Sequence, residues 1–146
     1  MRSLFRSIVV AGGILMLAGV QSANAQIVDS LEFTTAFPFT AGNATVPAGS
    51  YTIRPADNDP AILELTGAHT SVFFATESAQ PRETPSKDEV VFSRYGNGYV
   101  LKNIWLEGSD FGYITQAAEG ERHVSKRGES ASEQRVAARK KANASR

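Results

Sequence analysis

Short β-prone runs, separated by turn residues at close intervals, constrain the fold of this chain more than any other feature. Along residues 29–39 the large apolar side chains all fall on odd positions, which is the period of a strand with one buried face. Further β-prone runs occur at 51–54, 61–66, 70–76, 89–95, 98–106 and 111–116. About seven strands with no helical period between them predict an all-β fold, an antiparallel sandwich or barrel.

The residues that interrupt these runs predict where the chain turns. Gly67-Ala68 and Gly96-Asn97 are typical of hairpin turns. Pro38 cannot donate a ladder hydrogen bond, so the first strand is expected at a sheet edge or bent there. Residues 78–87 contain two prolines and no strong apolar residue, and they are predicted to form an exposed loop.

The first 25 residues have the features of a secretory signal peptide. Arg2 and Arg6 precede an apolar run of 13 residues, and Ala23-Asn24-Ala25 fits the small-x-small pattern before a cleavage site at Gln26. The run is shorter than the ~20 residues of a spanning helix. We therefore expect a periplasmic or secreted protein with no stable membrane span after cleavage.

The chain contains no cysteine, which excludes disulfides, thiolate metal sites and a lipidated cysteine anchor. Exported eukaryotic domains of this size usually carry disulfides. The combination of a short signal peptide and no cysteine favours a bacterial envelope or secreted protein.

Charge divides the mature chain into two parts. Residues 26–120, the predicted β-domain, carry five Lys and Arg against twelve Asp and Glu, whereas residues 121–146 carry eight against three. Within this basic tail a capping-box pattern begins at Ser130, and residues rich in Ala, Arg and Lys follow it to Ala142. This sequence predicts a solvated helix or a flexible tail. Its candidate anion-binding residues are Arg135, Arg139, Lys140 and Lys141.

A tail of this charge can bind anionic lipid or envelope polymers. The alternative is that it is a solvated extension with no binding role. Nucleic acid is a poor candidate because the tail has no aromatic residue for base stacking.

No catalytic, cofactor-binding or metal-binding constellation is present in the sequence. His69 and His123 stand alone, and Ser109 has the spacing of a turn rather than of a nucleophile elbow. Four carboxylates fit solvent-facing strand positions, with a glycosidase-type pair as the alternative; they are Glu32, Glu64, Asp88 and Glu89. The sequence thus predicts a protein that is not an enzyme and uses no cofactor.

Aromatic residues gather in the last three predicted strands. Either they fill the core, or they form a platform for a sugar, a peptide or a small apolar ligand. The parity that Trp105 shares with Tyr99 and Leu101 favours the core for that residue. The candidate platform consists of Tyr95, Tyr99, Trp105, Phe111 and Tyr113.

Four segments together resemble a group of small exported β-rich proteins that are abundant in acidobacterial genomes. They are Phe37-Pro38-Phe39, residues 46–53 (VPAGSYTI), residues 91–96 (VFSRYG) and residues 99–105 (YVLKNIW). The resemblance implies an exported β-rich protein and supplies no catalytic residue.

The function expected from the sequence is therefore a structural, adhesive or interaction role of a non-enzymatic β-domain in the bacterial envelope or outside the cell. The alternative is a binding protein that holds a small hydrophobic ligand or a glycan with the aromatic C-terminal strands. Candidate partners are envelope polymers, anionic lipid or another exported protein.

Overall fold

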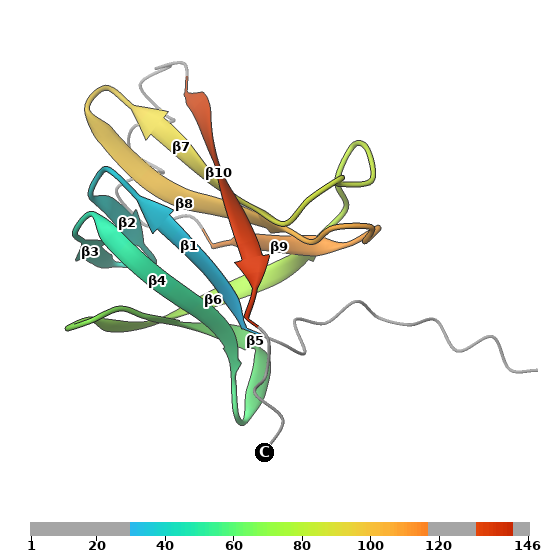
Figure 1. The fold of residues 1–146 in the computed structure, drawn as a ribbon, viewed down its shortest axis with the longest axis horizontal. Coiled ribbons are helices and arrows are strands. Elements are labelled where there is room, and N and C mark those ends of the chain that lie inside the picture. The colour runs from blue at the N-terminus through green and yellow to red at the C-terminus, as the bar shows by residue number, and fades with distance from the viewer. Residues whose placement is uncertain (1–29, 117–130, 142–146) are drawn as a thin grey trace, which may run out of the picture.

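The computed structural model describes residues 30–116 and 131–141, and these residues form ten β-strands (Figure 1). The predicted signal peptide and the cleavage site at Gln26 lie outside the described residues. Within the described part, no helix has the length and apolar character that crossing a membrane requires. The strands are β1 (Leu31–Thr35), β2 (Phe39–Ala41), β3 (Ala44–Val46), β4 (Gly49–Ala56), β5 (Asp59–Thr66), β6 (Ser71–Ala79), β7 (Glu89–Tyr95), β8 (Gly98–Trp105), β9 (Gly112–Thr115) and β10 (Ser132–Lys140).

Eight of the strands close into an antiparallel barrel. Their order is β8-β7-β10-β1-β4-β5-β6-β9, and β9 returns to pair with β8. Each of these eight strands has a paired neighbour on both sides over at least part of its length. Closure therefore satisfies backbone groups that the edges of an open sheet would expose. The all-β prediction is confirmed, and of the two architectures left open the barrel is the one observed.

The other two strands, β2 and β3, form a hairpin outside the ring. β9 pairs only with Thr76–Ala79 of β6 and with Asn103–Trp105 of β8. Nearer the start of β8, β2 is the neighbour, with the single pair Thr40 and Val100 in parallel register. The predicted bend near Pro38 is observed, because β1 ends at Thr35 and β2 begins at Phe39.

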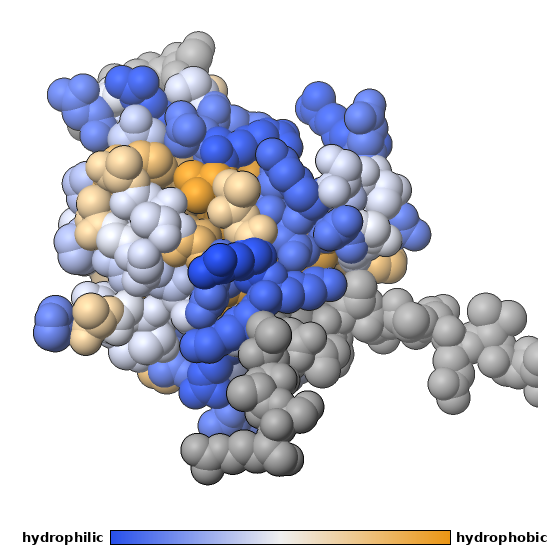
Figure 2. Space-filling view, in the orientation of Figure 1, coloured by the Kyte–Doolittle hydropathy of each residue, from blue (hydrophilic) through white to orange (hydrophobic). Residues whose placement is uncertain are grey.

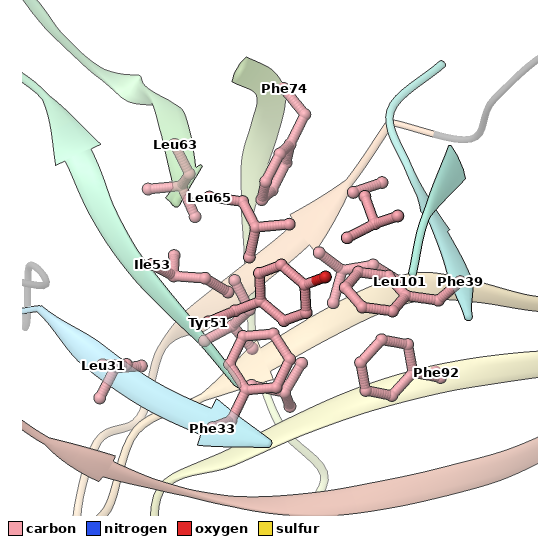
Figure 3. Close-up of a cluster of buried hydrophobic side chains, with 14 of the residues drawn as sticks. Leu31, Phe33, Phe39, Tyr51, Ile53, Leu63, Leu65, Phe74, Phe92 and Leu101 are labelled. Atoms are coloured by element: carbon pink, nitrogen blue, oxygen red, sulfur yellow. The ribbon is translucent and has the colours of Figure 1, made fainter. Parts of the chain in front are cut away.

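The barrel interior is filled by side chains (Figure 3). Four aromatic rings meet at its centre with centroid separations of 5.0–6.2 Å, a spacing typical of favourable ring packing. They belong to Phe33, Phe39, Tyr51 and Phe92. Phe39 comes from the outer hairpin, so β2 and β3 contribute to the same core as the barrel strands.

A β-bulge interrupts the pairing of β7 with β8. Phe92 pairs with Leu101, but Val91 pairs with Asn103, so Lys102 is an extra residue on β8. A bulge places two residues opposite one and shifts the alternation of side chains by one position.

This shift reverses the orientation expected for Trp105. Tyr99 and Leu101 face the core before the bulge, whereas Ile104 takes the inward position after it. Trp105 therefore points outward and is half-buried on the outer surface. The core placement predicted for Trp105 is wrong, because parity is a guide only along a strand without an inserted residue.

The helix predicted within the basic tail is also wrong for residues 132–140. These residues form β10, which pairs with β7 on one side and with β1 on the other (Figure 1). Helix propensity is a weak preference, and the slot between β1 and β7 offers backbone partners on both sides. Val136 and Ala138 face the core and are partly buried. The remainder of the tail lies largely outside the described residues.

Candidate functional site

The predicted aromatic platform is divided between different surfaces. Tyr99 stacks on Phe37 with ring centroids 3.9 Å apart, and Tyr113 packs against the core. Phe111 is 40% exposed beside β9, whereas Tyr95 ends β7. The structure does not gather the five rings on one face, and among them it is Trp105 that lines a groove.

That groove lies between the β6–β7 loop and the outer face of the barrel. It has a volume of about 810 Å³ and is lined by loop residues 79–86 and by outward-facing side chains of β7, β8, β9 and β10. Val91 lies on the outer face of the barrel but is only 1% exposed, so that face is covered at this point. The segment 78–87, predicted as an exposed loop, thus forms one wall of a groove.

The floor of the groove is set by cross-strand pairing. Trp105 pairs with Gly112 of β9, where a Cβ atom would lie 2.2 Å from the Cε3 atom of the indole. The indole therefore lies directly over the backbone of Gly112, which glycine permits. Next to this pair, Asn103 faces Ile114, and both line the groove. An indole, an aliphatic side chain and a carboxamide thus lie side by side.

The opposite wall is a network of charges. The Nη1 atom of Arg135 lies 3.0 Å from the Glu89 carboxylate, and its Nη2 atom lies 3.3 Å from that of Glu133. Lys87 also contacts Glu89, at 3.3 Å. The hydrogen bond with Glu89 raises the pKa of Arg135 above its ordinary value. The guanidinium is therefore held in place between two carboxylates, which hydrogen-bonds it at two points.

Hydrogen bonds to the β8–β9 turn fix the position of the loop. The N–H of Gly108 donates to the carbonyl of Pro85 at 2.9 Å. The buried carboxylate of Asp88 accepts the N–H of Glu107 at 2.9 Å. These two hydrogen bonds join backbone groups and one buried carboxylate. Contacts within the protein therefore hold this wall of the groove in place.

The basic residues predicted to bind anions contact the barrel instead of forming a separate patch. Arg135 belongs to the groove wall, and Arg139 and Lys141 each lie 3.4 Å from the Glu32 carboxylate. Lys140 is exposed on β10. Their binding to anionic polymers stays a prediction, but three of the four have carboxylate neighbours of their own.

The remaining candidates for chemistry have structural surroundings. Ser109 accepts the N–H of Phe111 and donates to its carbonyl at 2.7 Å, so it forms the predicted turn. Glu64 pairs with Arg54 on the outer surface. Among the described residues, no three His, Asp or Glu side chains come together as a metal site would need.

The sequence marks Trp105, Glu89, Arg135 and the loop as separate candidates, each for a different reason. Asn103 and Ile114 are not among the candidates that the sequence indicates. Their role in the groove depends on the bulge at Lys102 and on the β8–β9 register, and local sequence carries no clear signal for either.

Comparisons of the chain with protein-family models, with curated proteins and with solved structures find no match. Function is therefore inferred from the geometry of the groove.

Proposed function

We propose that this protein is an exported, non-catalytic β-barrel that binds a glycan of the bacterial envelope or its surroundings in the groove between the β6–β7 loop and the barrel. The observation that carries the proposal is that Trp105, Asn103 and Arg135 line the same groove. Export is supported by the signal-peptide features of residues 1–25.

The composition of the groove suits a sugar better than a purely apolar ligand. A pyranose ring has an apolar C–H face, which the indole of Trp105 can contact, and hydroxyls at its edge. The carboxamide of Asn103 and the charged groups of Arg135 and Glu89 supply both donors and acceptors for those hydroxyls. The groove has a volume of about 810 Å³, which lies within the range of about 300–1,000 Å³ that is usual for ligand pockets.

The core argues against a ligand inside the barrel. The interior positions are occupied by packed side chains such as Phe33, Tyr51 and Phe92, each 5% exposed or less. Packing of this kind leaves no room for a lipid or another apolar molecule. The binding function expected for the aromatic strands is therefore proposed for the outer face.

The experiment that tests the proposal uses the one tryptophan of the chain. Because Trp105 lines the groove, its fluorescence should change when chitotetraose, cellotetraose or maltotetraose is titrated into the protein. Arg135→Gln should weaken binding by about tenfold or more, since it removes hydrogen bonds from a charged group. Trp105→Leu, followed by calorimetry, should weaken it by a similar factor.

Arg139→Gln is the matched control, because Arg139 lies on the same strand but pairs with Glu32 outside the groove. It should leave affinity within about twofold of the parent, in line with small effects of exposed ion pairs. If none of the three sugars changes Trp105 fluorescence at millimolar concentration, or if the control weakens binding as much as Arg135→Gln, the proposal is wrong.

A further inference from the structure

The strand that closes the barrel, β10, is attached to it differently from every other strand of the ring. β4 and β5 are joined by two residues, and so are β7 and β8. Sixteen residues separate the end of β9 at Thr115 from the start of β10 at Ser132. Fully extended, a connection of that length reaches about 50 Å, which is more than the width of a small barrel.

β10 is also weakly anchored in the core. Its two inward apolar side chains, Val136 and Ala138, are small and only partly buried. The neighbouring strands β1 and β7 contribute larger, fully enclosed residues, such as Leu31 and Phe92. Burial of apolar surface scales with area, so β10 gains less from the core than its neighbours do.

The junction of β10 with β1 is the shorter of the two antiparallel junctions that β10 makes. Six residue pairs join β10 to β7, but only three, beginning at Leu31 and Lys140, join it to β1. A depression of about 610 Å³ lies at this junction. In Figure 2 the face that carries β10 shows a band of hydrophilic side chains beside a small apolar area.

Backbone pairing and exposed charges therefore hold β10 more than hydrophobic packing does. The ion pairs of Glu32 with Arg139 and Lys141, and of Glu89 with Arg135, lie on its outer face. Exposed pairs of this kind contribute little each and are screened by salt.

From these observations we propose that β10 is an exchangeable strand, and that the slot between β1 and β7 accepts β10 from a second copy of this chain. Every contact of β10 is reproduced when the strand comes from a partner, so exchange sacrifices no native pairing. The balance is then set by concentration, because a strand on the same chain acts at an effective concentration of the order of millimolar.

Exchange would also make the groove a composite site. Glu133 and Arg135 lie on β10, whereas Trp105 and Asn103 lie on β8. In the exchanged dimer each groove would therefore combine residues of both copies. The exchange itself requires no ligand, so its test is independent of glycan binding.

The absence of cysteine allows a direct test by cross-linking. Glu32 and Arg139 face each other in the β1–β10 register. One protein carries Glu32→Cys and a second carries Arg139→Cys; the two are refolded together at about 1 mM and then oxidised. Exchange brings the two introduced thiols together across chains, and it predicts a mixed disulfide several times more abundant than either homodimer.

The matched control uses the facing residues Thr52 and Thr66 of β4 and β5, which are joined by a two-residue turn. Proteins with Thr52→Cys and Thr66→Cys should form the mixed disulfide only in the proportion that random pairing gives, about twice the amount of either homodimer, because this hairpin does not exchange. The proposal is overturned if the Glu32→Cys and Arg139→Cys pair behaves like this control.

A second measurement keeps the test decisive if either single variant folds poorly. The parent protein should show a dimer fraction that rises with concentration in sedimentation or size-exclusion experiments near 1 mM. The double variant Glu32→Cys/Arg139→Cys, oxidised at micromolar concentration to lock its own β10, should stay monomeric at 1 mM. A parent that is fully monomeric there also overturns the proposal.

Discussion

At the scale of single residues, two aromatic rings of this protein lie over glycines on neighbouring strands or turns. A Cβ atom at Gly67 would lie 2.5 Å from the ring of Tyr51, and one at Gly112 would lie 2.2 Å from that of Trp105. Both distances are below the separation that Cβ atoms tolerate. The same device thus fixes a core ring and a groove ring, and it explains why these two positions carry no side chain.

Tyr51 also gives the molecule a response to alkaline pH. Its ring is 5% exposed, and its hydroxyl donates to the carbonyl of Pro47 at 2.6 Å. Burial raises the pKa of the Tyr51 phenol above its ordinary value of about 10. A raised pKa in the folded state means that stability is complete below about pH 10 and is lost as the pH rises through the folded pKa.

We predict that the free energy of unfolding falls as the pH rises above about 10, and that Tyr51→Phe reduces this fall. At neutral pH the variant should be less stable by about 1 kcal/mol, because it loses one hydrogen bond. Urea unfolding at each pH measures both effects. The other tyrosines are common to the two proteins, so parallel pH profiles for parent and variant would contradict the role given to Tyr51.

At the scale of elements, strands with local turn signals could be predicted and long-range pairings could not. The β7–β8 hairpin was predicted because Gly96-Asn97 lies between two β-prone runs, and Gly96 has the positive φ of 58° that such a turn uses. The bulge at Lys102 has no comparable signal. It changed the side of the sheet on which Trp105 lies, and with it the location of the candidate site.

The misassigned β10 shows the same limit. Its Ala- and Arg-rich sequence is typical of a helix, and its three consecutive apolar residues, Val136 to Ala138, do not show a period of two. The slot that it fills is created by β1 and β7, which lie about 40 residues or more away in the chain. Tertiary pairing, absent from any local window, decides the structure of this segment.

The strand assignment of β10 is tested by two adjacent substitutions. Val136 faces the core and Ala137 faces outward across from Glu89. Val136→Asn should lower the free energy of unfolding by about 1–3 kcal/mol, because it buries an amide without a prepared partner. Ala137→Asn should change it by about 0.5 kcal/mol or less. Equal effects in urea unfolding would contradict the alternation of a strand.

At the scale of the whole molecule, charge separation in the sequence becomes contact in the fold. The acidic β-domain supplies Glu32 and Glu89, and the basic C-terminal segment supplies Arg135 and Arg139. A segment predicted as a separate tail is thus, over residues 132–140, the eighth strand of the barrel. The barrel body and β10 are thus complementary in charge where they meet.

The position of the barrel in the chain is compatible with removal of the predicted signal peptide. β1 begins at Leu31, five residues after Gln26, so cleavage there leaves all ten strands in place. We predict that the exported protein begins at Gln26, as mass spectrometry of periplasmic and culture fractions would show. Replacing both Ala23 and Ala25 by Leu should block this cleavage, because signal peptidase requires small residues there.

Since the chain has no cysteine, residues 26–146 made in the cytoplasm should unfold at the same urea concentration as the exported form, with or without reductant. A protein recovered only from the membrane with Met1 intact would contradict export, and a different unfolding midpoint would contradict a fold independent of its compartment.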